Sequence, residues 1–451
     1  MIRKSHSYPK RLRKLYYLLL IGSIGLIGAD RIDLLAGHGP FILTPFLVLA
    51  PPVLLIGLLR AGPHRLFRLT ISGPMQRQIP FLAALSLFLF FAFGSILFSL
   101  DPERSLVAFA DLLIVAFFGY CISVQILAEP KRENLIARSV TFALAVYVIF
   151  CIAECIAWSQ GLTINAQRTG SWVQSTFAPN TFLNLAPILS GTTFDANRSG
   201  FVLMMYLVLL DRFAAKWRYT PGFRILISVL ILLTLSRSAT LCWLAYHFFS
   251  RSFWKKLLSR RVMARTVSIA IVGSLLCVAY QKELLELLDA WEISDAVSAK
   301  LSMDPGSSGE NHILLIQRGM TTWQTSAKTV VAGIGFAAAP KVLEDFFQDD
   351  KHGNFHSLYV TALAEMGLPA FLILMVILVY PVVGRSGALP CIAAVMIFNV
   401  SYQTHMEPVF WLILALMWSY GMERSDFNRV SVFSSKPPAG TATTAVSQEV
   451  S

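Results

Sequence analysis

The sequence predicts an all-α protein that crosses a membrane about twelve times. The first reason is composition: of 451 residues, 55% are apolar and only 14% are charged, whereas soluble domains carry about 25% charged residues. The second reason is that the apolar residues fall in runs near the ~20 residues that a helix needs to cross a hydrocarbon core. A soluble fold would need a single apolar core far larger than domains build.

The apolar runs divide the chain into five parts: a basic segment at 1–14, nine spans within 15–281, a polar loop at 282–356, three spans within 357–421, and a tail at 422–451. The predicted spans are 15–29, 41–59, 80–99, 105–127, 139–158, 200–215, 222–236, 238–250, 266–281, 357–383, 386–402 and 408–421. The spans at 222–236 and 238–250 are short, which fits either a broken pair or a re-entrant feature. The tail is rich in Ser, Thr, Ala and Pro, and we expect it to be disordered.

The first span also resembles the apolar region of a signal peptide, because it is short and follows a basic segment. We expect it to be retained, since the sequence GLIGAD at its end is a poor cleavage context. The six cysteines all lie in apolar runs, and none is spaced as a Cys-x-x-Cys pair. They are predicted to be small core residues rather than disulfide partners.

Positive charge sorts the connections between spans into two sets. Of the 38 Lys and Arg residues, 27 lie in the N-terminal segment, the C-terminal tail and alternate connections. Because basic residues stay on the cytoplasmic side of a membrane, both termini are predicted to be cytoplasmic, with an even number of spans. The formal net charge of +12 is then explained by topology and by attraction to lipid headgroups, without a nucleic-acid partner.

Two loops on the opposite, outer side are long, at residues 159–199 and 282–356. Loops of this length are usually functional or disordered. The second loop begins with apolar residues that fall near one helical face: Leu284, Leu287, Leu288, Trp291 and Ile293. This spacing predicts an ordered helix that lies on the membrane surface or covers the spans.

Three arginines lie on the outer side, which otherwise avoids cations: Arg198 and Arg237 beside spans, and Arg318 in the long loop. A guanidinium is always charged and can donate to two phosphate oxygens at once, so the three could converge on an anion. Arginine at membrane depth usually faces protein or an aqueous cavity. The alternative is an arginine that only reaches to the membrane interface.

His356 stands where the long loop returns to the membrane. An imidazole with an ordinary pKa near 6.5 suits proton transfer at neutral pH. The alternative role is a hydrogen-bonding cap of the helix that follows. His352 and His405 lie on the same predicted side and are competing candidates.

Three acidic residues lie within apolar spans, and we expect them to pair inside the helix bundle, with a proton relay as the alternative: Asp111, Glu154 and Glu365. No stretch matches the Gly-rich nucleotide loop, and the pair Asp349-Asp350 has no partner ligands at metal spacing. The sequence therefore predicts no cofactor and no metal. It favours a substrate that is already activated, with arginines that stabilise the charge of the leaving group.

Several short motifs follow one another in the second half of the chain: LSRSATL around Arg237, Arg318 shortly before Trp323, Gly-x-Gly-Phe at Gly333–Phe336, His-x-x-Tyr at His356–Tyr359 and Glu-x-Gly-Leu at Glu365–Leu368. In this order and topology they resemble the O-antigen ligase and polymerase superfamily over about residues 190–380. The chain departs from that pattern at Ser357, where many members carry Asn.

The resemblance implies a GT-C-like, metal-independent glycosyltransferase of the bacterial inner membrane, with the loop at 282–356 in the periplasm. It implies that Arg237 and Arg318 bind the pyrophosphate of an undecaprenyl-pyrophosphate-linked glycan. It also implies that His356 orients or deprotonates the acceptor hydroxyl, with Glu365 and Tyr359 in supporting places. Arg198 has no matching motif residue, so it is the weaker candidate and rests on its position alone.

Two functions within the superfamily stay open, because they differ only in the acceptor. A ligase, which is the first choice, transfers the glycan to lipid A-core. A polymerase transfers it to the next lipid-linked repeat of O-antigen, capsule or exopolysaccharide. A non-enzymatic transporter or flippase of lipid-linked glycan is the more distant alternative, since transporters often show internal repeats with broken helices and no such symmetry is evident.

Overall fold

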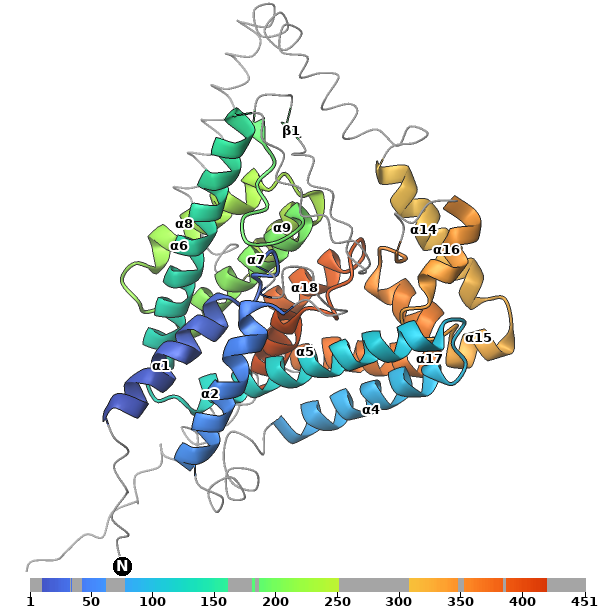
Figure 1. Cartoon of the computed structure of the whole chain (residues 1–451), viewed down its shortest axis with the longest axis horizontal. Helices are drawn as coiled ribbons and strands as arrows, with labels where there is room; N and C mark the ends of the chain where they lie inside the picture. Colours follow the sequence, from blue (N-terminus) through green and yellow to red (C-terminus); the bar gives the residue numbers. More distant parts are fainter. Residues whose placement is uncertain are drawn as a thin grey trace, which may run out of the picture.

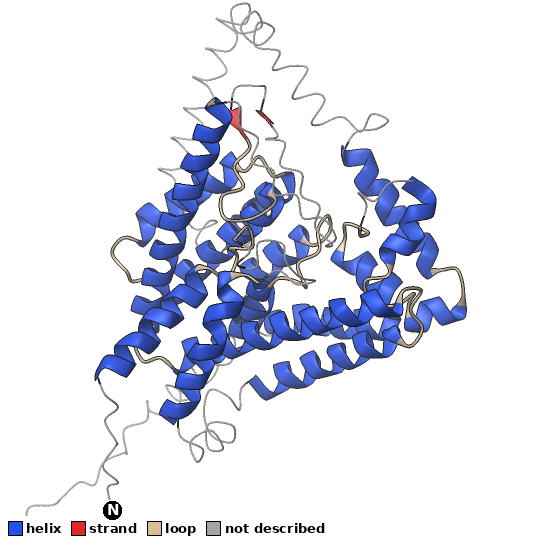
Figure 2. Ribbon diagram, in the orientation of Figure 1, coloured by secondary structure: helices blue, strands red, loops and turns tan. Residues whose placement is uncertain are grey.

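The computed structural model describes residues 10–32, 34, 43–61, 78–160, 181–182, 186–250, 308–347, 353–383 and 387–419. In these parts the chain is mainly helical (Figures 1 and 2), with one short antiparallel strand pair, β1 (Thr181–Phe182) and β2 (Ala186–Pro187). The predicted span at 266–281, the predicted surface helix that begins near 282, and His352 lie outside the described residues.

The first half of the described chain holds eight helices, which are α1 (Lys10–Gly25), α2 (Pro45–Ala61), α4 (Ile79–Ile96), α5 (Pro102–Ala128), α6 (Arg132–Ser159), α7 (Ala196–Phe213), α8 (Thr220–Leu233) and α9 (Arg237–Phe248). The second half holds α14 (Ser308–Trp323), α15 (Ala327–Ala332), α16 (Ala339–Phe347), α17 (Leu358–Val379), the 3₁₀ turn η2 (Tyr380–Val382), α18 (Leu389–Phe398) and a last helix, Pro408–Ser419. Each predicted span within the described residues contains a helix.

Four helices are long and apolar enough to cross a membrane by length and composition: α4, α5, α6 and the continuous stretch Leu358–Val382. Shorter apolar helices are Pro45–Leu59, Thr220–Leu233, Leu389–Phe398 and Pro408–Ser419. The total of twelve spans and the GT-C-like topology therefore stay predictions. The two short spans near 222–250 are separate helices, α8 and α9, joined at Leu235, whose φ is 50°. This arrangement fits both a broken pair and a re-entrant feature, so both stay predictions.

The outward faces of several helices are apolar. Phe90 on α4 is 66% exposed, and Ile225 on α8 is 68% exposed. Soluble proteins rarely expose extended apolar patches, so these faces fit a lipid environment. By contrast, α7 and the last helix are buried along almost their whole length, as expected for helices that are apolar all round.

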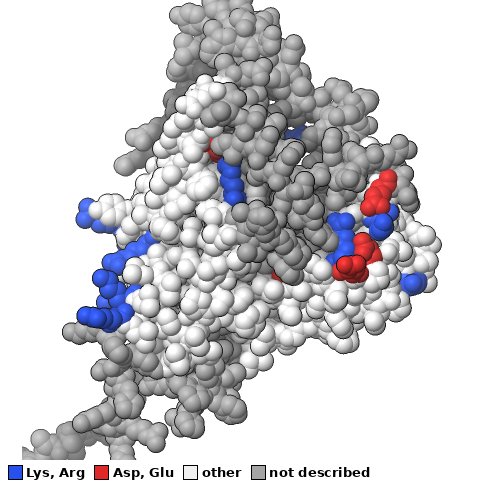
Figure 3. Space-filling model, in the orientation of Figure 1, with Lys and Arg blue, Asp and Glu red and all other residues white. Residues whose placement is uncertain are grey.

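Several helix ends and short helices lie in two separate regions of the molecule. In Figure 1, the start of α1, the end of α2 and the α5–α6 connection lie toward the lower left, whereas α14, α15 and α16 gather at the right. On the face drawn in Figure 3, basic side chains collect at the left-hand edge, and a mixed acidic and basic group lies at the right. Which of these sides faces the cytoplasm stays a prediction.

The described cysteines are free thiols: Cys121, Cys151, Cys155, Cys242 and Cys391. Cys151, Cys242 and Cys391 are buried as predicted, Cys121 is half-buried, and the prediction of a core position is wrong for Cys155, which is exposed on the surface of α6. In the part of the chain that the structure describes, no group of three or more His, Cys, Asp or Glu side chains could hold a metal ion.

Candidate functional site

The Gly-x-Gly-Phe and Glu-x-Gly-Leu motifs pack against each other and break α17. Gly367 interrupts this helix with φ 81° and ψ 175°. Pro369 has no N–H group, so the Glu365 carbonyl has no helical donor four residues later. The N–H of Gly335 donates to that carbonyl at 3.0 Å, and the N–H of Ile334 donates to the carbonyl of Ala364 at 2.9 Å. The break in α17 is therefore filled by the Gly-x-Gly-Phe loop.

The loop fits only because two glycines meet at the break. A Cβ on Gly333 would lie 2.2 Å from the Glu365 carbonyl oxygen, and a Cβ on Gly367 would lie 2.1 Å from the Val331 carbonyl oxygen. Both residues also have positive φ, 73° for Gly333 and 81° for Gly367, which a side chain would strain. We call residues 333–337 together with 364–367 the glycine latch.

The buried side chain of Glu365 completes the glycine latch. Its carboxylate accepts the N–H of Ala337 at 2.8 Å and the N–H of Ala339 at 3.1 Å. Ala339 is the first residue of α16, where N–H groups lack helical partners and favour negative charge. Glu365 was expected to pair inside the bundle. It does so by accepting backbone N–H groups, which fixes the Gly-x-Gly-Phe loop and the start of α16 beside α17.

His356 is held in an unusual backbone conformation just before α17. Its φ is 53°, a left-handed value that few residues other than glycine adopt. The side-chain oxygen of Asn354 accepts the His356 N–H at 2.8 Å. The N–H of Leu358, at the start of α17, donates to the carbonyls of Asn399 at 3.1 Å and Tyr402 at 2.9 Å. Such strain persists only where the surroundings enforce it, and it clusters at functional sites.

A cavity of about 440 Å³ lies beside His356, which we call the outer cavity. It is lined by the starts of α5, α7 and α17, by the Gly-x-Gly-Phe loop and by the segment before the last helix. Its titratable or charged lining residues are Asp30, Arg104, Asp111, Asp195, Arg198, His356, Glu365, His405 and Glu407. The cavity therefore combines two histidines, two arginines and several carboxylates at a size that suits part of a substrate.

Arg198 lines the outer cavity but is neutralised by two carboxylates. It forms ion pairs with Asp30 and Glu407, and 18% of its side chain is exposed. Asp195 caps α7 by accepting the Asn197 N–H at 3.1 Å, and its other oxygen accepts the Tyr402 hydroxyl at 2.9 Å. We call Arg198, Asp30, Glu407, Asp195 and Tyr402 the Arg198 cluster.

Burial favours the protonated, neutral forms of Asp30 and Glu407, two acids of the Arg198 cluster. It raises the pKa of Asp30 to about 7 despite the attraction of Arg198, and the nearby Glu407 adds to the rise. Burial also raises the pKa of Glu407. In the same wall, burial lowers the pKa of His405 to about 4, so this ring stays neutral and is a poor base near neutral pH.

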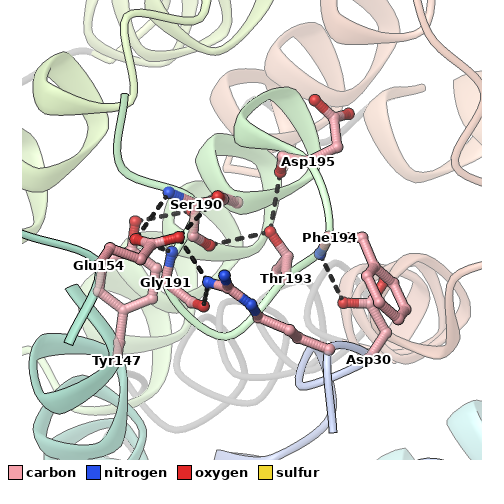
Figure 4. A network of polar contacts seen from close by, with 10 residues as sticks. Asp30, Tyr147, Glu154, Ser190, Gly191, Thr193, Phe194 and Asp195 are labelled. Atoms are coloured by element: carbon pink, nitrogen blue, oxygen red, sulfur yellow. Dashed lines mark hydrogen bonds and ion pairs between the residues drawn. The ribbon is translucent and has the colours of Figure 1, made fainter. Parts of the chain in front are cut away.

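A second polar network holds the loop before α7 (Figure 4). The Glu154 side chain forms an ion pair with Arg31. It also accepts the Ser190 hydroxyl at 2.9 Å and the Gly191 N–H at 3.0 Å. Arg31 in turn donates to the Gly191 carbonyl at 3.0 Å. Glu154 thus pairs inside the bundle, as the sequence predicts, and ties α6 to the loop that leads into the Arg198 cluster.

Three candidate residues lie outside the lining of the outer cavity. Arg237 is exposed at the first position of α9, where Ser236 caps the helix by accepting the Ala239 N–H at 3.1 Å. Arg318 is half-buried on α14. The Tyr359 hydroxyl donates to the Met396 carbonyl at 2.8 Å. Tyr359 therefore ties α17 to α18, while both arginines remain candidates for an anion that would extend beyond the cavity.

Comparison with known protein families agrees with the motifs found in the sequence. The family model described as O-antigen ligase matches residues 222–375. Residues 222–375 of this chain are therefore similar to the O-antigen ligase family. The match confirms the resemblance drawn from the motifs, and it contains Arg237, Arg318, His356 and the glycine latch. A search among curated proteins finds no match.

Part of the outer cavity is supplied by elements outside the matched residues 222–375: α5, α7 and the segment before the last helix. The sequence reasoning did not select Arg104, Asp30 or Glu407, because none lies in a recognisable motif. Within residues 222–375, the sequence reasoning also missed His312, although this residue stands six positions before Arg318. In the structure the His312 ring centroid is 4.3 Å from that of His356. The signal that the sequence offered for His312 was a histidine close to Arg318, in addition to His356.

Proposed function

We propose that this protein transfers a glycan from undecaprenyl pyrophosphate to an acceptor hydroxyl at the periplasmic face of the bacterial inner membrane. The observation that carries the proposal is the position of His356 at the outer cavity, within the matched O-antigen ligase domain. The fixed backbone of His356 and the glycine latch support it, because transfer needs a base held in one place. The apolar outward faces of α4 and α8 support a membrane location.

In the proposed reaction, the acceptor oxygen attacks the anomeric carbon of the lipid-linked sugar. A new C–O bond forms as the bond to the pyrophosphate oxygen breaks, and that oxygen keeps the bonding electron pair. His356 takes the proton of the acceptor hydroxyl as a general base. Arg237 and Arg318 stabilise the negative charge on the leaving pyrophosphate. Arg198, already paired with two carboxylates, is the weakest of the three candidate arginines for this role.

A ligase that uses lipid A-core as acceptor is our first choice, and a repeat-unit polymerase is the alternative. The decisive assay reconstitutes the purified full chain in liposomes with a lipid-linked glycan donor. Lipid A-core and a lipid-linked repeat are offered in separate reactions. We expect a glycosylated lipid A-core product, lost in His356→Gln. Product only with the lipid-linked repeat would assign a polymerase, and donor crossing the bilayer without any product would assign a transporter.

The side of the membrane can be tested with single cysteines in a chain whose native cysteines are replaced. Gln324 is exposed in the turn between α14 and α15, and Lys216 is exposed in the connection between α7 and α8. We expect Gln324→Cys to react with a membrane-impermeant thiol reagent in intact spheroplasts. Lys216→Cys should react only after the membrane is opened. The reverse pattern would place the outer cavity in the cytoplasm and would contradict the proposed function.

A further inference from the structure

His312 on α14 makes direct ring contact with His356. The two ring centroids are 4.3 Å apart and the ring planes meet at 69°, an edge-to-face arrangement. Aromatic rings prefer this geometry when they pack in pairs. His312 does not line the outer cavity. It contacts His356 from α14, so it can act on the reaction only through His356.

Helix packing fixes this contact. Gly319 lies two turns after His312 on α14, and a Cβ there would be 2.4 Å from Val360 and 2.9 Å from Phe355. These two residues stand on either side of His356 in the sequence. The backbone of α14 is therefore docked against the segment that carries His356, and Leu315 and Phe355 belong to one small buried core. His312 meets His356 as a consequence of this docking.

We propose that His312 is a positioning residue for His356: it orients the ring and limits the two histidines to one shared proton near neutral pH. Two imidazolium rings in contact repel each other, so interacting groups of this kind lose their protons in two separate steps. Repulsion between the rings favours the neutral form of His356, which is the form that can accept a proton. When His356 takes the proton of the acceptor hydroxyl, His312 is neutral, so the pair then carries one proton in total. This inference rests on the proposed base role of His356.

The other charged groups around the pair are unchanged by substitutions at position 312. Arg104 and Asp111 on α5, Glu365 on α17 and the Arg198 cluster line the same cavity. Buried His405 also lines it, and α14 adds Arg318. Because these groups are present in every variant, a change in the titration of His356 on removal of the His312 nitrogen atoms reports the coupling between the two rings.

The experiment compares His312→Phe, His312→Ala and the control His247→Phe in the full-length protein. Phenylalanine keeps a ring at position 312 but cannot bind a proton. His247 packs against Trp243 and Tyr246 at the end of α9, away from the outer cavity. The first readout is the titration midpoint of the His356 imidazole, followed by NMR with labelled histidine and assigned by its loss in His356→Gln. The second is the pH dependence of kcat for glycan transfer.

We expect His312→Phe to move the titration midpoint of His356 and the acidic limb of kcat upward by about one pH unit. The reason is that no neighbouring imidazolium ring then opposes protonation of His356. KM for the donor should stay within about twofold. His312→Ala should also lower kcat at the pH optimum, since it removes the ring contact as well. The control should change neither quantity.

An unchanged His356 midpoint in His312→Phe would overturn the proposal, even if transfer is normal. If the midpoint moves but no variant or parent chain transfers glycan, the two-histidine coupling stands and the proposed function fails. If His312→Phe does not fold, His312→Gln supplies the same comparison, since an amide does not titrate either. Equal midpoints in that variant and the parent chain would be equally decisive against the coupling.

Discussion

One wall of the outer cavity is fixed by charge, and the opposite wall is fixed by backbone geometry. At the start of α7, Arg198 pairs with Asp30 and Glu407, and the Arg31–Glu154 pair anchors the loop before it. At the start of α17, Asn354 holds the His356 N–H, and backbone hydrogen bonds join the two halves of the glycine latch.

The difference separates a supporting wall from a reacting wall. Buried charges that pair with one another fix a structure, but their charge is already balanced and offers less to a substrate. The backbone conformation of His356 sets where its ring lies, and its N–H is bonded to Asn354. We therefore propose that the chemistry takes place at the α17 wall and that the α7 wall supports it.

The largest expected effect is on transfer by His356→Gln, which should lower kcat by about 10²–10⁴-fold. Glutamine can make hydrogen bonds but cannot accept a proton at working pH. Transfer from purified lipid-linked donor is measured together with donor binding, which should persist. The matched control is His405→Gln in the segment before the last helix, which lines the same cavity; this ring is a poor base and should matter far less. Near-normal turnover in His356→Gln would leave His356 as a helix cap only.

Arg318 should follow, with a loss of about 10²–10³ in kcat for Arg318→Ala, which corresponds to about 3–4 kcal/mol. Arg318→Lys keeps the charge but loses the planar pair of donors, so it should retain only part of the activity. Lys328→Ala on α15, where the amine lies over the Phe98 ring, controls for removal of a cation from the same region. Normal transfer by the alanine variant, at unchanged protein level, would rule out a role for Arg318 in binding the pyrophosphate.

The sequence points to the residues of the α17 wall more readily than to those of the α7 wall, for a physical reason. His356, Glu365 and the glycine motifs lie close along the chain, so their spacing is visible in the sequence. The Arg198 cluster joins residues near positions 30, 198 and 407, and only the fold brings these together. Helix positions followed from apolar runs, but the ends of short helices depend on tertiary contacts that the runs do not encode.

The glycine latch offers a test of the backbone-held wall that does not need a substrate. Gly333→Ala places a Cβ 2.2 Å from a carbonyl oxygen at φ 73°, and the contact cannot be relieved by turning a side chain. We expect a loss of at least about 2 kcal/mol in stability, seen as a lower unfolding temperature in detergent. Gly94→Ala on α4 meets nothing within 4 Å and should be neutral or stabilising. Equal effects of the two changes would mean that the latch is not a fixed contact.

The smallest expected effect tests the charge-held wall through pH. The folded protein raises the pKa of Asp30 from 3.8 to about 7, so between these values the folded chain holds a proton that the unfolded chain has lost. Stability from this group is therefore full below about pH 4 and is lost as pH rises toward 7. Asp30→Asn cannot titrate, so its unfolding temperature should fall less between pH 5 and pH 7. The difference in stability should be at least that of a pKa shift of one unit, about 1.4 kcal/mol.

The control is Glu344→Gln, a change at an exposed side chain on α16, which should leave the pH dependence as it is. Parallel pH curves for Asp30→Asn and the parent chain would show that Asp30 is ionised throughout, and that the α7 wall is an ordinary set of ion pairs.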